Sequence, residues 1–143
     1  MIRLVVDASV SVKWFIRGSI EEEDLESAVD LLVGVGKNRI VLIQPPHWIA
    51  EVAAVLSRLQ PHLVDDAIDL LDAMQISTSA DNNVYKLASH LAIELNHHLF
   101  DTLYHALAIN EKAELVTADQ RYFRKSKQHG SICLLSELKL ETY

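Results

Sequence analysis

The feature that most constrains the fold of this chain is the alternation of short apolar runs with longer stretches of helical periodicity. Apolar, β-branched runs occupy residues 2–6, 40–43, 114–117 and 132–135, and amphipathic stretches separate them. Strands that alternate with helices form a mostly parallel sheet with right-handed crossovers and helices on both faces. The sequence therefore predicts the α/β class, with one domain over residues 1–143, because this length is typical of a single domain.

Helical periodicity and turn residues predict the other elements. We expect helices at 22–34, 47–59, 65–74 and 82–95, a helix opened by Asp101, a short strand within 75–78, and a short helix or turn within 120–129. The pair Gly34 and Gly36 should end the first of these helices as a C-cap, and Asn96 should cap the helix at 82–95. Gln44 and the two prolines after it should form a break.

Four acidic side chains stand at or near one predicted edge of the sheet. Asp7 ends the first apolar run, Asp119 follows the run at 114–117, Asp101 opens a helix, and Glu51 lies within an apolar helical stripe. The carboxyl ends of parallel strands share an edge, where α/β sheets bind ligands. Three of the four acids also have a simpler interpretation. Asp7 and Asp101 are favourable N-caps, and Glu51 could reach solvent at the edge of its stripe or pair with an Arg.

Clustered carboxylates need a neutralising partner. Two unit charges about 4 Å apart repel by about 4 kcal/mol at an effective dielectric of about 20, against a domain stability of about 5–15 kcal/mol. Protons or a basic side chain could neutralise the cluster, but an all-oxygen set without cysteine suits Mg²⁺ or Mn²⁺. Such an ion leaves room for a phosphate group and can activate a water molecule.

Four segments together resemble the acidic motifs of PIN-domain ribonucleases, and most closely those of the VapC-like toxins of bacterial toxin–antitoxin pairs. They are LVVDAS around Asp7, IAEVAAVL around Glu51, FDTLYHALA around Asp101 and LVTADQRYF around Asp119. The segments occur in the family's order and cover essentially the whole chain. The resemblance implies a three-layer α/β/α PIN-like domain with a mostly parallel central sheet.

The resemblance also implies roles for six residues. Asp7 and Asp101 would be the principal ligands of one or two Mg²⁺ or Mn²⁺ ions, and Asp119 would be a ligand directly or through water. Glu51 would orient a metal-bound water or ligate a second ion. Ser9 and Thr117 would hydrogen-bond to the acids. These residues would hydrolyse RNA phosphodiester bonds.

The resemblance further implies partners. A small antitoxin would block the site, and the toxin would form a homodimer. The alternative to this endoribonuclease is a PIN-like partner- or RNA-binding module without catalytic activity. A receiver domain and a haloacid-dehalogenase-like phosphatase fit less well, because Val6 replaces the receiver's second acid and Ser9 the phosphatase's second Asp.

The distribution of basic residues points to an RNA contact. The formal net charge is −7, which argues against polyanion binding over the whole surface. Five basic residues near the motifs are candidates for contacts with the RNA backbone: Lys13, Arg17, Arg121, Arg124 and Lys125. The alternative is that these residues do not contact RNA and lie on a solvated or dimer-facing surface. The long acidic loop at 20–24 is less typical of the family, so the sequence does not define where the substrate enters.

Other chemically active side chains have structural explanations. Trp14 and Tyr104 lie in apolar rows typical of a core, whereas Tyr122 is open to either a core role or base stacking. Three histidines near the third motif could suggest a transition-metal site, but surface or core roles fit them better: His97, His98 and His105. Cys133 should be a buried apolar residue. The sequence shows no signal peptide or membrane span, so we expect a cytoplasmic protein.

Overall fold

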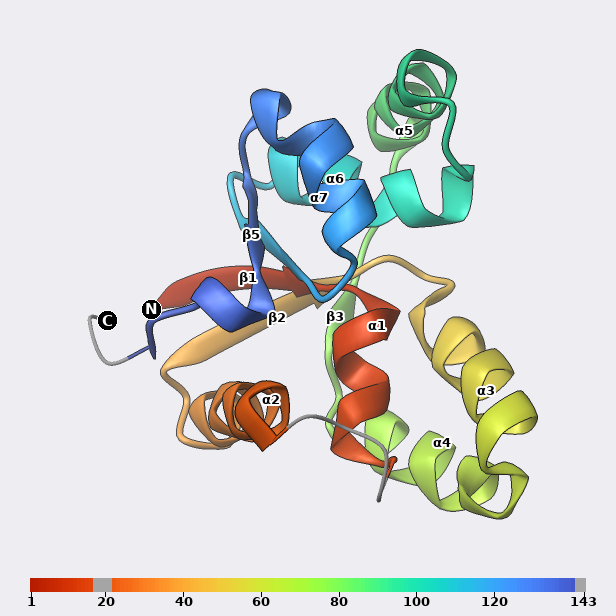
Figure 1. The fold of residues 1–143 in the computed structure, drawn as a ribbon, viewed down its shortest axis with the longest axis vertical. Helices are drawn as coiled ribbons and strands as arrows, with labels where there is room; N and C mark the ends of the chain where they lie inside the picture. The colour runs from red at the N-terminus through yellow and green to blue at the C-terminus, as the bar shows by residue number, and fades with distance from the viewer. Residues whose placement is uncertain (17–21, 141–143) are drawn as a thin grey trace.

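A five-stranded parallel sheet forms the centre of the computed structural model, which describes residues 1–16 and 22–140 (Figure 1). The strands are β1 (Ile2–Val6), β2 (Ile40–Gln44), β3 (Ser77–Thr78), β4 (Glu114–Thr117) and β5 (Ile132–Leu134). Their order in the sheet is β3-β2-β1-β4-β5, and every neighbouring pair is parallel.

Helices cover both faces of this sheet. They are α1 (Ala8–Ser11), α2 (Glu22–Gly36), α3 (Trp48–Leu59), α4 (Val64–Ala73), α5 (Asn82–Leu95), α6 (Leu99–Asn110) and α7 (Gln120–Ser126). Figure 1 shows α5, α6 and α7 on one side of the sheet and α1 to α4 on the other. The predicted three-layer α/β/α architecture is confirmed. In the part of the chain that the structure describes, no helix has the length and apolar content needed to cross a bilayer.

The strand order places a topological switch between β1 and β4. From β1 the chain moves outward to β2 and β3, and then returns to the other side of β1 to form β4 and β5. Val6 pairs with Val116, so Asp7 and Thr117 emerge side by side at the carboxyl ends of neighbouring strands. Open parallel sheets bind their ligands at such a switch.

The two central strands are buried on both faces, which explains their continuous apolar sequence. Leu4, Val5 and Val6 of β1 are buried, and so are Leu115 and Val116 of β4. Helix α6 adds an unbroken buried segment over residues 102–108. The core therefore fixes the ends of β1 and β4 firmly beneath the acidic residues.

Three local predictions are wrong, and the first two concern the ends of helices. Helix α2 continues through Gly34 to Gly36, and the left-handed residue after it is Asn38, with φ of 57°. Gly34 serves packing instead, because a Cβ there would lie 2.5 Å from the side chain of Ile40. Helix α6 begins at Leu99, so its N-cap is His98 and Asp101 lies inside the first turn.

Gln44 is not part of a break but the last residue of β2, where it pairs with Thr78. Its side chain is fully buried and extends the hydrogen bonding of β1. The Val6 N–H donates to Gln44 Oε1, and Gln44 Nε2 donates to the Val6 carbonyl, both at 2.8 Å. These bonds hold the residue that precedes Asp7.

Candidate active site

Asp7 acts as the N-cap of helix α1 and is also part of an acidic site. Its Oδ2 accepts hydrogen bonds from the Ser9 N–H at 3.3 Å and the Ser9 hydroxyl at 2.5 Å. The Asp7 N–H donates to the carbonyl of Val116 on β4 at 3.0 Å. Asp7 is therefore the N-cap of α1, and its position at the end of β1 also places it at the carboxyl edge of the sheet.

Ser9 and Thr117 connect the ends of the two central strands. Thr117 Oγ1 donates to Asp7 Oδ2 at 3.4 Å and accepts the Asp119 N–H at 3.1 Å. The Ser9 hydroxyl accepts the Ala118 N–H at 3.1 Å. Both hydroxyls thus fix Asp7 relative to the loop that carries Asp119.

Asp119 is the N-cap of α7, where its Oδ1 accepts the Tyr122 N–H at 3.0 Å. Asp101 approaches from the first turn of α6, and its side chain is 38% exposed. Asp7, Asp101 and Asp119 line one small cavity together with Thr117, Leu115 and Tyr122. Three carboxylates from separate parts of the sequence therefore meet at the carboxyl edge of the sheet.

Burial and mutual repulsion perturb these acids. Burial raises the pKa of Asp7 to about 6; its hydrogen bonds from Ser9 oppose this increase, and the charges of Asp101 and Glu51 add to it. The pKa of Asp101 is also raised, by burial first and then by the charge of Glu51, whereas His97 lowers it. All four acids, including Glu51, are thus close enough to interact electrostatically.

Glu51 has a histidine partner that the sequence analysis did not predict. His47 Nε2 lies 3.3 Å from Glu51 Oε1 and 2.9 Å from the carbonyl oxygen of Phe100. The His47 ring also packs against Tyr104, with ring centroids 4.9 Å apart. Burial and the charge of Glu51 raise the pKa of the Tyr104 hydroxyl, so Tyr104 remains protonated beside the acids.

A second histidine contacts Asp101. His97 Nε2 lies 3.0 Å from Asp101 Oδ2, and Lys125 Nζ lies 3.2 Å from His97 Nδ1. Both histidines precede their acids by four residues, His47 as the N-cap of α3 and His97 just before the N-cap of α6. This spacing was the signal in the sequence that could have found His47 and His97.

The donor set fits a hard divalent cation in its chemistry. The side chains that meet are carboxylates, and a cation between them would replace repulsion by attraction. Cys133 lies on β5, and burial raises the pKa of its thiol to about 12, so no thiolate competes. Among the described residues, no three or more His, Cys, Asp or Glu side chains have an arrangement that could hold a metal ion. The acids would therefore have to draw together around a cation.

The basic candidates divide into exposed and engaged residues. Arg121 and Arg124 are exposed on α7, which begins directly after Asp119. Lys125 is half-buried, and its ammonium donates to the Asn96 carbonyl at 3.3 Å as well as to His97. Lys13 Nζ lies 3.9 Å from Asp24 Oδ2, within the range of an ion pair. Arg17 and the start of the acidic run at 20–24 fall outside the described residues.

The aromatic residues considered for base stacking are all buried. Trp14 donates from Nε1 to the Ala28 carbonyl at 2.9 Å, and Tyr104 is fully buried. The Tyr122 hydroxyl donates to Nδ1 of the buried His105 at 2.8 Å. Phe100, the residue before Asp101, is instead 59% exposed, and its ring centroid lies 5.4 Å from that of His47. The sequence analysis missed Phe100 because it sits in an apolar pair that leads into the motif.

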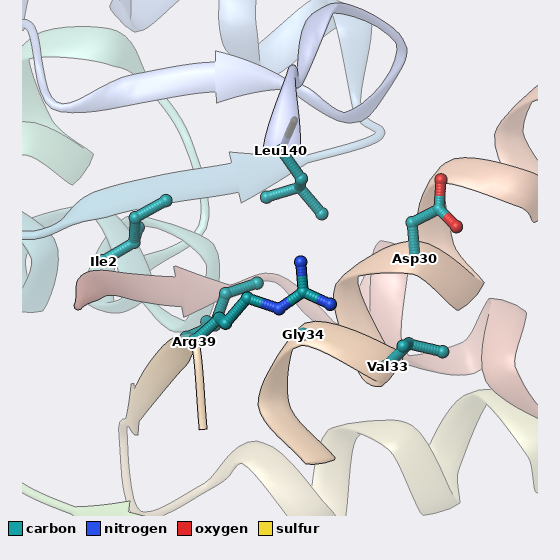
Figure 2. A pocket seen from close by; sticks show the side chains of 7 residues that line it. Ile2, Asp30, Val33, Gly34, Arg39 and Leu140 are labelled. Atoms are coloured by element: carbon teal, nitrogen blue, oxygen red, sulfur yellow. The ribbon is translucent and has the colours of Figure 1, made fainter. Parts of the chain in front are cut away.

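A larger pocket, of about 210 Å³, lies at the opposite edge of the sheet (Figure 2). Its lining includes Ile2 and Ile40 at the starts of β1 and β2, and Asp30 and Arg39 contribute one charge of each sign. Figure 2 shows the Arg39 side chain extending over the C-terminal part of α2, across the pocket from Leu140. This pocket contains none of the four acids, so its size does not make it the reactive site.

Comparisons with known proteins agree with this geometry. The model of the PIN domain family matches residues 4–128. A solved structure with the same fold is PAE2754 from Pyrobaculum aerophilum, with a TM-score of 0.61 and 16% sequence identity over 94% of this chain and 90% of that one. Comparison with the curated protein sequences gave no significant match. Because the family model covers most of the sequence, the chain belongs to the PIN domain family.

Proposed function

We propose that this protein is a Mg²⁺- or Mn²⁺-dependent endoribonuclease that hydrolyses phosphodiester bonds in RNA. PIN domains are typically nucleases, and PIN nucleases generally use divalent metals. The observation that carries the proposal is the meeting of Asp7, Asp101 and Asp119 in one cavity at the switch between β1 and β4. Repulsion among ionised acids at a sheet edge is a cost that a scaffold would have no reason to keep.

Each acid has a role in this mechanism. Asp7 and Asp101 would hold the cation as principal ligands, Asp119 would bind it directly or through water, and Glu51 would orient a water molecule or hold a second ion. Ser9 and Thr117 keep Asp7 in place through their hydrogen bonds. When bound, the cation would neutralise charge at the phosphate and make water a better nucleophile.

The RNA contacts follow from the exposed residues around the cavity. Arg121 and Arg124 are exposed on α7, directly after Asp119, and on this proposal they contact phosphates of the RNA backbone. Phe100 offers an exposed aromatic face next to Asp101, on which an unpaired base can stack. These contacts favour single-stranded RNA, because the bases of a duplex are already stacked on one another.

The toxin role rests on the resemblance to VapC-like proteins. On this proposal the protein acts on cytoplasmic RNA, a small antitoxin covers the acidic cavity, and the toxin forms a homodimer. Sedimentation of the purified chain at micromolar concentration tests the dimer directly. A monomer at that concentration would refute the homodimer but leave the nuclease proposal intact.

The nuclease is tested by incubating the protein with a pool of single-stranded RNA. Cleavage should require Mg²⁺ or Mn²⁺, stop in EDTA, and fall by at least about a hundredfold in Asp7→Asn. Induced expression in a bacterial host should arrest growth, and Asp7→Asn should relieve the arrest. Cleavage that persists in EDTA or in folded Asp7→Asn would refute the mechanism. Wild type that binds RNA without cleaving it in either metal would favour the binding-module alternative.

A further inference from the structure

A chain of contacts joins helix α7 to Asp101 through His97. Lys125 Nζ lies 3.2 Å from His97 Nδ1, and His97 Nε2 lies 3.0 Å from Asp101 Oδ2. Lys125 also donates to the carbonyl of Asn96, at 3.3 Å. Three segments of the chain, α7, the turn between α5 and α6, and the first turn of α6, are thereby connected beside the acidic cavity.

The chemistry of these groups determines which ring nitrogen of His97 carries the proton. A lysine ammonium is only a donor, so Nδ1 must be the acceptor in its contact with Lys125. In a neutral imidazole the other nitrogen then carries hydrogen. The Nε2–H of His97 therefore donates to the Asp101 carboxylate. The contacts with Lys125 and with Asp101 thus require the same form of His97, and Lys125 stabilises this form from the Nδ1 side.

The His97 ring is also held by packing. Its side chain is only 11% exposed, and its ring centroid lies 4.7 Å from that of Tyr122. Tyr122 donates its own N–H to Asp119 Oδ1 at 3.0 Å. Helix α7 thus supports two of the acids at once, Asp119 through the Tyr122 backbone and Asp101 through the ring of His97.

We propose that His97 is a positioning residue for Asp101 and that Lys125 holds His97 in its Nε2–H form. Lys125 therefore acts on the acidic site through His97 and not as a contact for the RNA backbone. This inference rests on the proposed function, because it takes Asp101 to be a ligand of the divalent cation. A hydrogen bond to one oxygen of a ligating carboxylate fixes the orientation of the group and leaves its other oxygen for the metal. Loss of such a partner typically weakens metal affinity about 10- to 100-fold.

The test measures binding of Mn²⁺ alone, by the electron paramagnetic resonance signal of free Mn²⁺, with circular dichroism as a check of folding. His97→Ala should weaken Mn²⁺ binding by about 10- to 100-fold. His97→Gln keeps an N–H donor near the Nε2 position and should restore most of the affinity. Asp101→Asn is the reference for loss of the ligand itself.

His98→Ala is the matched control. His98 is exposed, its side chain makes no capping hydrogen bond, and its ring lies 6.2 Å from that of His97. This variant should bind Mn²⁺ as wild type does. Equal weakening in His98→Ala and His97→Ala would indicate a general effect on the turn and would overturn the positioning role.

The outcomes separate this inference from the proposed function. Wild-type Mn²⁺ affinity in folded His97→Ala, together with weak binding in Asp101→Asn, would overturn the positioning role alone. Wild-type affinity in Asp101→Asn would overturn both the ligand assignment and the role of His97 that depends on it.

The Lys125 step has its own readout. Nitrogen-15 spectra of the imidazole groups should show His97 as the Nε2–H tautomer in wild type. In Lys125→Met, which keeps the length of the side chain but removes the donor, the signal should move toward a mixture of tautomers. An unchanged spectrum would overturn the role of Lys125. RNA affinity that falls in Lys125→Met while Mn²⁺ affinity stays unchanged would identify Lys125 as a backbone contact instead.

Discussion

At the scale of single residues, Asp7 is subject to two opposing effects. As the N-cap of α1 it accepts the Ser9 N–H and hydroxyl, which stabilises its charged form. Burial beside Asp101 and Glu51 disfavours the same charge and outweighs the cap, so the pKa of Asp7 rises to about 6. The metal-free protein therefore carries a local electrostatic cost at neutral pH.

Asp7→Asn should relieve this cost. The pKa of Asp7 rises from 3.8 to about 6 on folding, so wild type loses stability as pH increases through this interval. The full penalty, present above about pH 6, corresponds to about 3 kcal/mol at most. In Asp7→Asn the hydrogen bonds from Ser9 to the neutral amide are weaker, and this loss offsets part of the gain in stability. In EDTA at pH 7, Asp7→Asn should raise the free energy of unfolding by about 1–2 kcal/mol, with no gain at pH 4. Urea unfolding across pH 4–8 measures both.

Metal should reverse the ranking of the two proteins. At a hundredfold excess over Kd, Mn²⁺ should stabilise wild type by about 2.7 kcal/mol, and Asp7→Asn by much less. Equal metal stabilisation in the two proteins would contradict the assignment of Asp7 as a ligand. A metal-free Asp7→Asn that is less stable than wild type at pH 7 would contradict the balance of burial and capping described above.

At the scale of secondary-structure elements, Gln44 makes the end of β2 part of the site's support. Its amide satisfies both the N–H and the carbonyl of Val6, in a fully buried position. A buried polar group that loses its partner costs about 1–3 kcal/mol. The end of β1, and with it Asp7, thus depends on one side chain of the neighbouring strand.

Gln44→Ala should therefore lower the free energy of unfolding by about 2–5 kcal/mol, because two backbone groups of Val6 lose their partner. Urea unfolding measures this loss. The matched control is Gln120→Ala, at an exposed position on the first turn of α7, which should change stability by less than about 0.5 kcal/mol. Similar stability of Gln44→Ala and wild type would show that the two hydrogen bonds contribute little.

At the scale of the whole molecule, a net charge of −7 must be reconciled with an RNA substrate. The structure leaves Arg121 and Arg124 exposed on α7, while Lys125 is engaged with His97 and Lys13 lies near Asp24. RNA binding should therefore depend on a local contact beside Asp119 and not on the surface as a whole. Such binding weakens with salt in proportion to the number of phosphates contacted.

The double variant Arg121→Ala and Arg124→Ala should weaken binding of single-stranded RNA and lower its salt slope by about 1.4, or about 0.7 per phosphate contact. Phe100→Ala should instead cost about 1–3 kcal/mol of binding free energy with the slope unchanged. Both are measured by fluorescence anisotropy in the Asp7→Asn background, which prevents cleavage.

Arg58→Ala, an exposed arginine in the last turn of α3, is the control for general charge and should leave the salt slope unchanged. A slope that falls equally in Arg58→Ala would contradict a local contact on α7. Full RNA affinity in Phe100→Ala would exclude base stacking at that position.

The sequence by itself determined the elements and their order, because these depend on patterns between near neighbours. The 3.6-residue period placed α5 at 82–95, apolar content placed β4 at 114–117, and both ranges agree with the structure. Asn96 has the left-handed φ of 49° expected of its capping position. Parallel topology then brought Asp7 and Asp119 to one edge, since both follow strands of the same sheet.

Only the tertiary structure decided which side chains surround these acids. Lys125 contacts His97 across 28 positions of sequence, and Gln44 contacts Val6 across 38. Such pairs depend on how α7 packs beside the turn between α5 and α6, and on which strands become neighbours. The exposure of the aromatic side chains also depends on this packing, since Tyr122 is buried and Phe100 is exposed. Local periodicity specifies the face of an element, whereas the groups that this face meets are set by the packing of the whole chain.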